Sequence, residues 1–268
     1  MLTDAHCHPF DIAPLLPEFE NERRRLEVLI AASACGINEF AHNEILSLNA
    51  DAQNAAPVFL CFGIHPQYLS QIHSLTDADT KIEDLIDFLT NLAEKKQLDA
   101  VGEIGFDLFN AAFKETEKEQ GQVFKTQLEI ALRYELPVVL HVRRAMHKVF
   151  AYSKALSKCK AVVFHSWSGT YEEGISLLQH GINAYFSFGN TIILNHKQAI
   201  KSCALFPTER ILTETDAPYQ PRRREAFSTW SDLPLILEAS AALRNEAGNK
   251  INTDELELII ENNFRKIF

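Results

Sequence analysis

The sequence repeats one arrangement five times: a short apolar run, then a residue able to bind a metal ion, then an irregular segment. The residues at these places are four histidines and two carboxylates: His6, His8, Glu103, His141, His165 and Asp216. In a (β/α)8 barrel, side chains at the carboxyl ends of the strands converge on one mouth. The pattern therefore predicts an α/β protein with the (β/α)8 TIM-barrel fold and a metal site at that mouth.

The rest of the chain fits such a barrel as a single domain over residues 1–268, because barrels typically have roughly 250 residues. Eight apolar runs predict strands at 2–8, 26–33, 57–65, 99–105, 137–142, 161–167, 184–189 and 210–216. Apolar residues at helical spacing predict helices at 81–96, 117–134, 172–180 and 195–203, with extra C-terminal helices near 233–247 and 253–268. Irregular segments follow several strands, so we expect them at the mouth: 9–17, 67–80, 108–117 and 220–232.

Composition and charge limit what the protein can bind. With 46% hydrophobic and 23% charged residues, the chain can bury a large core, and disorder is not expected. The net charge of −10 argues against broad, nonspecific binding to nucleic acid or anionic lipid. A phosphate-bearing substrate would need local attraction from cations or a few arginines.

The cellular compartment is predicted from cysteines and apolar runs. The five cysteines are odd in number and form no CxxC pair, which is typical of thiols in a reducing compartment. No apolar run approaches the roughly 20 residues that span a bilayer. The first apolar run already carries ligand candidates, so it does not read as a signal peptide. We expect a soluble cytoplasmic enzyme without membrane contact.

The chemistry of the first three candidates suits divalent cations. His6 and His8 are two residues apart on one strand and face the same side, where they would form a bidentate ligand for Zn²⁺ or Mn²⁺. Glu103 lies between Gly102 and Gly105, which would let other groups approach its carboxylate closely. A carboxylate can bridge two cations about 3.5–4 Å apart. The alternatives are an ordinary histidine pair and an ion-paired glutamate.

The other three candidates depend on their joint placement. His141 and His165 each end an apolar run, and either one alone would more often hydrogen-bond a loop carbonyl. Asp216 precedes Ala-Pro, where an aspartate can form a turn, coordinate a metal or accept a proton from water. Placement of all six residues at strand ends favours the metal site.

Motifs in the order and spacing of a known family extend through nearly the whole chain: DAHCH at 4–8, FGIHP at 62–66, GEIGFD at 102–107, QLEIALRYELPVVLHVRRA at 127–145, HSWSG at 165–169, FSFGN at 186–190, ETDAPY at 214–219 and NNFRKIF at 262–268. In these motifs the chain resembles the TatD-type metal-dependent deoxyribonucleases, within the amidohydrolase-like barrels. The resemblance implies that one cation is held by His6, His8, Glu103 and Asp216. It implies that the other is held by Glu103, His141 and His165.

The chain also departs from the family pattern. It has HSWSG where the family commonly has HCFSG, which leaves His165 in place. The loops at 108–117 and 220–232 diverge, and both are expected to contact substrate. Whether these loops mark a specialised pathway stays open.

Further residues are candidates for substrate contact. Arg143 follows His141 by two positions and is expected to face the same mouth, while His65 would support the site or touch substrate. An arginine run and several aromatic residues fall in or beside mouth loops, with solvated loops and plain packing as the alternatives: Arg222, Arg223, Arg224, Phe10, Phe106, Phe109, Trp167 and Tyr219. Among the aromatic residues, Trp167 and Tyr219 are the predicted substrate-binding residues.

These observations and the resemblance predict a metal-dependent hydrolase that acts on ester bonds, most specifically a phosphodiesterase or deoxyribonuclease. Two divalent cations (Mg²⁺, Mn²⁺ or Zn²⁺) would share Glu103 and activate water, with Asp216 as the general base and single-stranded DNA as the substrate. One alternative is an ester or amide hydrolase on the same scaffold, such as a D-aminoacyl-tRNA deacylase. Another is a non-catalytic, metal-stabilised scaffold in a larger complex. The sequence leaves the oligomeric state open.

Overall fold

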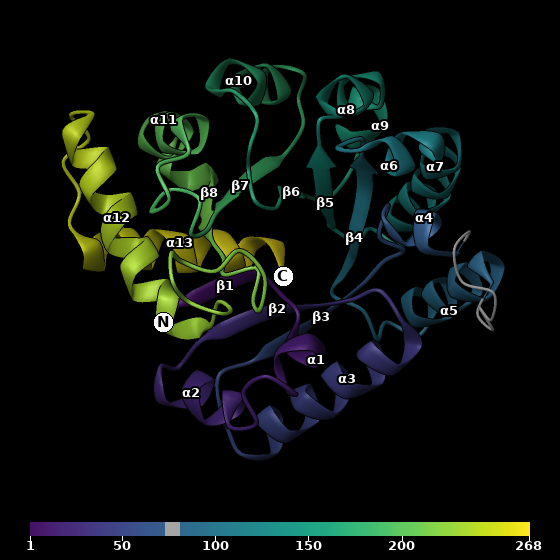
Figure 1. The fold of residues 1–268 in the computed structure, drawn as a ribbon, viewed down its shortest axis with the longest axis horizontal. Helices are drawn as coiled ribbons and strands as arrows, with labels where there is room; N and C mark the ends of the chain where they lie inside the picture. Colours follow the sequence, from purple (N-terminus) through teal and green to yellow (C-terminus); the bar gives the residue numbers. More distant parts are fainter. Residues whose placement is uncertain (73–80) are drawn as a thin grey trace.

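The computed structural model describes residues 1–72 and 81–268, and its centre is one sheet of eight strands in sequential order (Figure 1). Each strand pairs in parallel with the next along the chain. The strands are β1 (Thr3–Cys7), β2 (Leu29–Ala34), β3 (Val58–Phe62), β4 (Ala100–Asp107), β5 (Val138–Arg143), β6 (Val162–Phe164), β7 (Ala184–Phe188) and β8 (Ile211–Thr213). Every predicted apolar run overlaps one of them, so the predicted (β/α)8 barrel is confirmed.

The barrel closes between β8 and β1 through both side-chain and backbone hydrogen bonds. The Thr213 hydroxyl donates to the Thr3 carbonyl oxygen over 2.8 Å. The Asp4 carboxylate accepts hydrogen bonds from the Thr215 amide (2.9 Å) and hydroxyl (2.6 Å). Both Thr3 and Asp4 are buried, so these bonds are shielded from solvent. Polar side chains therefore add to the backbone hydrogen bonds from Asp216 to His6 (3.0 Å) and from His8 to Ala217 (2.7 Å) at this contact.

Helices surround the barrel (Figure 1). Along the first half of the chain they are α1 (Pro9–Ile12), α2 (Phe19–Arg25), α3 (Ile37–Ala52), α4 (Tyr68–Ile72), α5 (Ile82–Glu94), α6 (Ala111–Glu115) and α7 (Glu117–Arg133). The second half adds α8 (Met146–Ala151), α9 (Ser153–Leu156), α10 (Tyr171–Gln179), α11 (Lys197–Leu205), α12 (Leu233–Glu246) and α13 (Thr253–Ile267), with 3-10 turns at Thr208–Arg210 and Trp230–Asp232. All six predicted helices are present.

Several segments differ from the sequence-based expectation. The helices α2, α3, α8 and α9 were not predicted. The segments 9–17 and 108–117, expected to be irregular, contain the short helices α1 and α6, and α4 begins within the segment 67–80. The remainder of that last segment, residues 73–80, lies outside the described residues.

Two apolar layers place the functional end of the barrel. Large residues fill the space between the strands and the outer helices, for example Phe124 on α7 and Phe186 on β7. Small residues such as Ala5 and Ala31 fill the interior, where Phe264 and Ile267 of α13 pack against them. The helix α13 therefore covers the amino-terminal end of the barrel, which leaves the carboxyl-terminal mouth for polar groups.

None of the helices within residues 1–72 and 81–268 is both long enough and apolar enough to cross a membrane.

Candidate metal centre

The two histidines of the first motif present the same ring atom to the barrel mouth. His6 lies on β1 and His8 directly follows it, with their Nε2 atoms 3.1 Å apart. The Nδ1 atom of His6 lies 3.0 Å from the Ser33 hydroxyl oxygen on β2, which fixes the ring orientation. Ser33 was not predicted from the sequence. The pair thus has the arrangement expected for two neighbouring ligands.

Glu103 on β4 is 3% exposed, and its two carboxylate oxygens face different groups of histidines. Its Oε1 atom lies 2.6 Å from Nδ1 of His141 and 2.6 Å from Nε2 of His165. Its Oε2 atom lies 3.2 Å from Nε2 of His6 and 3.8 Å from Nε2 of His8. A carboxylate in this position has the geometry needed to bridge two cations.

Asp216 follows β8 and closes the arrangement from the other side. Its Oδ1 atom lies 3.6 Å from Nε2 of His6 and 3.5 Å from Nε2 of His8. Its Oδ2 atom accepts a hydrogen bond of 2.6 Å from the side-chain amide of Gln220. The Asp216 carbonyl also accepts from the Tyr219 amide, so this residue both forms a turn and contributes to the site.

The glycines beside Glu103 act differently from the expectation. A Cβ atom at Gly102 would lie 2.5 Å from the Val139 Cβ, and one at Gly105 would lie 2.1 Å from the His141 carbonyl oxygen. The groups that approach closely are therefore the backbone and side chains of β5, not ligands of the carboxylate. The glycines allow β4 and β5 to come together, which places Glu103 beside His141.

Asp107 is a further residue of the site that the sequence reasoning missed. Its Oδ2 atom lies 3.2 Å from Nε2 of His141 and accepts a 2.7 Å hydrogen bond from Gln67. Asp107 stands four positions after Glu103 on β4, and alternation along a strand puts both on one face. That spacing was the available signal. Because Asp107 occupies Nε2, His141 presents its Nδ1 atom to Glu103.

His65 lies closer to the centre than a supporting residue would need to. Its Nε2 atom is 3.3 Å from Oε1 of Glu103, and its ring centroid is 4.5 Å from that of His141. The potential ligand atoms form three groups, and within each group they lie no more than 4.8 Å apart. The groups are His6, Glu103 and His165; His6, His8 and Asp216; and His65, Glu103 and His141.

The electrostatics keep both carboxylates ionised. Burial on its own raises the pKa of Glu103, but His165 and other nearby histidines together hold it well below its ordinary value. Burial likewise acts to raise the pKa of Asp216, and the hydrogen bond with His8 and the neighbouring histidines lower it. Ionised carboxylates are the form that binds divalent cations.

The donor set tests whether a metal would fit. Imidazole nitrogens and carboxylate oxygens suit Zn²⁺, Mn²⁺ and similar ions. The Nε2 atoms of His6 and His8 lie 3.1 Å apart, and both lie within 4 Å of Oδ1 of Asp216, as ligands of one cation would. Around His165, the buried Nδ1 atom has no hydrogen-bond partner within the described residues, and Oε1 of Glu214 is 3.8 Å away. The residues fit a divalent cation.

The predicted substrate contacts have different outcomes. Arg143 is exposed at the end of β5, and Tyr219 is 48% exposed with its ring against His8. The expectation for Trp167 is wrong: it is 2% exposed, packs on Phe186 and donates its indole N–H to Ser202.

Two other mouth candidates also have structural roles. Phe106 is 1% exposed and packs on Phe124, so it is not at the mouth. Arg222 forms an ion pair with Asp232, whereas Arg223 and Arg224 are exposed.

Comparisons with known proteins agree with this geometry. The chain is 30% identical over 276 residues to the 3′-5′ ssDNA/RNA exonuclease TatD of Pantoea ananatis (strain LMG 20103), which covers 97% of this chain and 98% of the relative. It is 32% identical over 223 residues to the uncharacterized metal-dependent hydrolase YjjV of Escherichia coli (strain K12), which covers 81% of this chain and 80% of that relative. The crystal structure of YjjV, a TatD homolog, superposes with a TM-score of 0.81 at 27% identity, over 100% of this chain and 97% of the other. Residues 3–268 match the family described as TatD related DNase, and the chain therefore belongs to that family.

Proposed function

We propose that this protein hydrolyses phosphodiester bonds in single-stranded nucleic acid with the help of two divalent cations. The observation that supports this most directly is the orientation of Glu103, whose two oxygens face different sets of histidines. Relatives of the chain are named 3′-5′ ssDNA/RNA exonucleases and metal-dependent hydrolases, which supports the same class of reaction.

The proposed ligands of the first cation are His6, His8, Glu103 and Asp216, and those of the second are Glu103, His141 and His165. The structure adds His65 as a candidate neighbour of the second set, because its Nε2 atom lies 3.3 Å from Glu103. The donor atoms suit Zn²⁺ or Mn²⁺, and Mg²⁺ remains within the proposal. Bound cations would lower the pKa of water and offset the charge of the phosphoryl oxygens.

The protein's own groups would then align the substrate and move the proton. Asp216 is placed to accept a proton from the attacking water, because its carboxylate is ionised and lies at the mouth. Gln220 donates 2.6 and 2.8 Å hydrogen bonds to Asp216 and Ser166, which fixes the direction of the carboxylate. The exposed guanidinium of Arg143 would attract the phosphate locally in a chain of net charge −10.

The test compares wild type with Asp216→Asn, which keeps the side-chain shape but removes the base. Wild-type protein loaded with Mn²⁺, Mg²⁺ or Zn²⁺ should release nucleotides from single-stranded DNA and hydrolyse bis(p-nitrophenyl) phosphate. Asp216→Asn should lower kcat by about 10²- to 10³-fold, within the range for a general base. Asp51→Asn, which removes an exposed carboxylate on α3, serves as the control and should retain wild-type kcat.

A panel of carboxylic esters and a D-aminoacyl-tRNA separates this proposal from the alternatives. Metal-loaded wild type that cleaves esters or the aminoacyl bond but neither phosphodiester would contradict it and support a different hydrolase. Absence of turnover on every substrate, with metal bound, would favour the scaffold role.

We also propose that residues 1–268 act as one domain and that the protein works in the cytoplasm. The location is supported by the five cysteines, all of which are free thiols in the structure.

A further inference from the structure

Two arginine side chains lie over an aromatic ring at the mouth. The Cζ atom of Arg143 lies 3.6 Å from the centroid of the Phe109 ring, and that of Arg144 lies 4.5 Å from it. All three side chains are exposed, with Phe109 at 39%. Arg144 also donates a 3.4 Å hydrogen bond to the Phe109 carbonyl oxygen. We call these three residues the arginine–phenylalanine cluster.

The cluster is connected to the candidate metal centre through β4 and β5. Arg143 stands two residues beyond His141 on β5, so its side chain lies on the same side of the strand, about 7 Å further along. The Leu108 amide donates to the Arg143 carbonyl oxygen over 2.9 Å, which continues the contact between β4 and β5. Asp107 accepts from the Phe109 amide through one oxygen and contacts His141 through the other. One carboxylate therefore sets the position of both the cluster and a proposed ligand.

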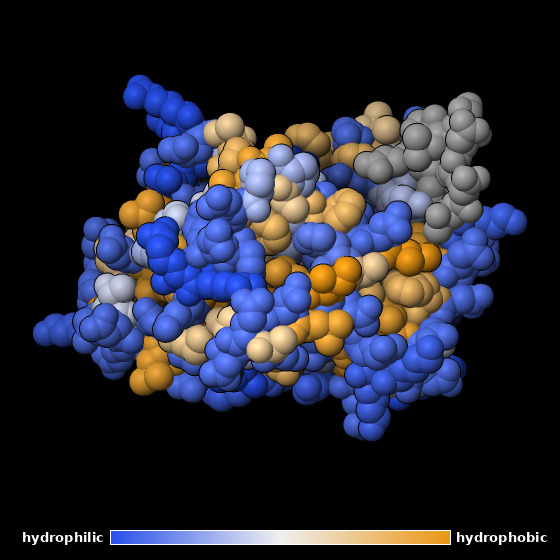
Figure 2. Space-filling view, turned by 90° about the horizontal axis from the view of Figure 1, so that it is seen from below, coloured by the Kyte–Doolittle hydropathy of each residue, from blue (hydrophilic) through white to orange (hydrophobic). Residues whose placement is uncertain are grey.

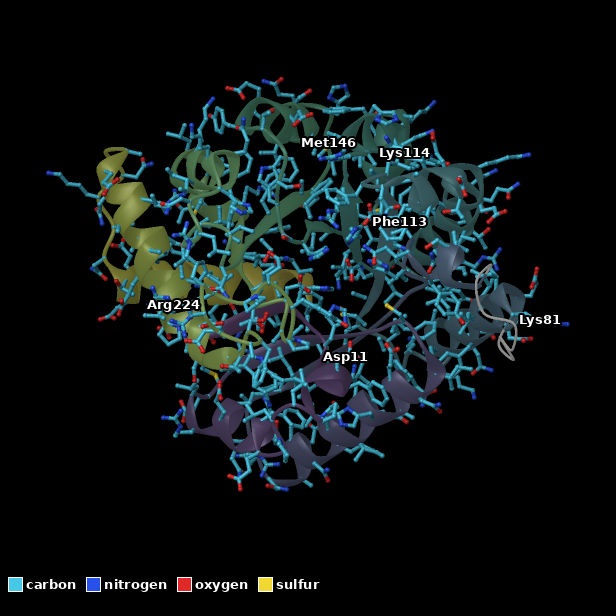
Figure 3. The ribbon with its side chains drawn as sticks, viewed as in Figure 1. Asp11, Lys81, Phe113, Lys114, Met146 and Arg224 are labelled. Carbon is cyan, nitrogen blue, oxygen red and sulfur yellow. The ribbon has the colours of Figure 1, made fainter. Side chains whose placement is uncertain are left out.

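The charge of the cluster is not neutralised within the described structure. Among residues 1–72 and 81–268, no ion pair includes the guanidinium of Arg143 or Arg144. Lys114 on α6 adds an exposed positive charge on the same side of the mouth, where Figure 3 labels it. In a chain of net charge −10, such a group is a local site for an anion.

The chemistry of the cluster suits a nucleotide. A guanidinium that lies on an aromatic ring still offers N–H donors at its edge to phosphate oxygens. Guanidinium planes and aromatic rings also stack on nucleobases, and this stacking requires a base that is free of its complementary strand. A site with both properties therefore favours single-stranded over duplex nucleic acid.

We propose that Phe109, Arg143 and Arg144 bind the nucleotide adjacent to the scissile phosphodiester of a single strand. The arginines would contact its phosphate, and the exposed guanidinium and ring surfaces would stack on its base. This inference rests on the proposed function. It adds the path by which the nucleic acid strand leaves the metal centre, which is over β4 and β5.

The experiment measures binding and turnover of a fluorescein-labelled deoxythymidine decamer, next to turnover of bis(p-nitrophenyl) phosphate. Binding is measured by fluorescence anisotropy in the Asp216→Asn background, so that it does not depend on cleavage. Arg144→Ala and Phe109→Ala should each raise Kd and KM for the decamer by about 5- to 20-fold, in line with the loss of one stacked base. Their loss of kcat/KM on the small ester should be at least fivefold smaller, because that ester has no adjacent nucleotide.

Two further variants sharpen the result. Arg144→Lys keeps the charge but not the planar group, so it should recover only part of the affinity. Lys158→Ala with Lys160→Ala removes two exposed positive charges at the other end of the barrel and should bind the decamer like wild type.

The outcomes separate the two proposals. If the wild type hydrolyses both substrates while Arg144→Ala and Phe109→Ala bind the decamer with unchanged Kd, the cluster has no role in substrate binding. Equal losses on the decamer and the small ester would also overturn it, since the residues would then act through the metal centre. If wild type neither binds the decamer nor hydrolyses either phosphodiester, the proposed function itself fails.

Discussion

Two contacts between strands position the candidate ligands, and they are built in different ways. At the contact of β4 with β5, Gly102 and Gly105 remove side chains so that the two backbones approach closely. At the contact of β8 with β1, a buried side chain adds to the backbone hydrogen bonds: Asp4 accepts two hydrogen bonds from Thr215. The first contact places Glu103 beside His141 and His165, and the second places Asp216 beside His6 and His8.

The difference teaches which changes each contact should resist. A contact that depends on missing side chains is sensitive to any added atom, because packed interiors have little free space. A contact that depends on a buried carboxylate is sensitive to protonation and to loss of an acceptor. The two sides of the mouth also differ in charge. Arg143 and Arg144 lie above β4 and β5, whereas Asp11 lies on the β1 side, away from Lys114 (Figure 3).

The largest effect is expected from Gly105→Ala. Gly105 has φ +142°, which disfavours any L side chain, and its new Cβ would lie 2.1 Å from the His141 carbonyl oxygen. The variant should lose about 5 kcal/mol of unfolding free energy, at the top of the range for single substitutions. Urea unfolding of the metal-free protein measures this loss.

Gly181→Ala is the matched control, because Gly181 also has a positive φ (+77°) but no atom within 4 Å of the added Cβ. It should lose only about 1 kcal/mol, the conformational cost alone. Equal losses in the two variants would show that the β4–β5 contact tolerates extra atoms, and the comparison would fail.

The second-largest effect is expected at the β8–β1 contact, whose contribution to the unfolding free energy should depend on pH. Burial raises the pKa of Asp4 from 3.8 to about 7, although hydrogen bonds from Thr215 oppose the rise. Between these values the folded protein keeps a proton that the unfolded chain has released. The unfolding free energy of the metal-free wild type should therefore fall as pH rises through this window, by up to about 4 kcal/mol.

Asp4→Asn removes this proton equilibrium, so its stability relative to wild type should improve as the pH rises from about 4 to about 7. Urea unfolding at the two ends of the window measures the change. Asp51→Asn, at an exposed position on α3, should follow the wild-type slope. A slope in Asp4→Asn that equals that of wild type would remove Asp4 as the pH-sensitive element of the β8–β1 contact.

The two contacts also explain what the sequence could and could not predict about the fold. Parallel strands are buried on both faces, so their apolar runs stand out. The sequence did not predict the helix α3, because polar and apolar residues occur on both of its faces. Its buried side includes Asn43 beside Phe40, while Ile45 and Leu48 are 60% and 62% exposed. Figure 2, which views the side of the molecule where α3 lies, shows apolar residues scattered on that surface.

Prediction of the site had a similar limit. The proposed ligands stood out because each one lies in or directly after an apolar run, and the structure brings all six together. Ser33 and Gln220 support them through contacts across the fold that no local pattern encodes. Trp167 was placed at the mouth because it is two residues from His165, but Ser166 between them has φ +44° and interrupts strand alternation. The ring turns into the apolar layer as a result.

A smaller effect is expected from Asp107→Asn, which tests whether the β4–β5 contact also depends on one carboxylate. With an amide in place of Oδ2, an N–H group would face both Gln67 and the protonated Nε2 of His141. His141 would then carry its proton on Nδ1, the atom that faces Glu103. Affinity for Mn²⁺ or Zn²⁺ should fall by about 10- to 100-fold, as for other groups that orient metal-binding histidines.

Isothermal titration calorimetry with each metal measures this affinity, and Asp87→Asn, an exposed site on α5, is the control. The binding enthalpy and the pH dependence of binding should both change in Asp107→Asn, because the proton on His141 has moved. Unchanged affinity would mean that the glycines alone are enough to position His141.

The smallest effect tests the charge difference across the mouth. Asp11 accepts a 3.0 Å hydrogen bond from the Tyr219 hydroxyl, and the Tyr219 ring lies against His8. Asp11→Asn keeps an acceptor oxygen but removes a negative charge. A unit charge about 10 Å from a phosphate contributes about 0.4 kcal/mol in water, so Kd for the deoxythymidine decamer should fall about twofold. Anisotropy at about 0.01 M and about 1 M salt measures this, because the Debye length shrinks from about 30 Å to about 3 Å and the gain should vanish.

The direction of the change in Kd distinguishes the two sides of the mouth. Arg144→Ala should weaken binding and Asp11→Asn should strengthen it, which is expected only if the strand leaves over β4 and β5 and avoids the acidic side. Weaker binding in Asp11→Asn at both salt concentrations would instead make Asp11 a group that holds the substrate by hydrogen bonding. In that case the strand would cross the β1 side as well, and the two sides of the mouth would share one role despite their opposite charge.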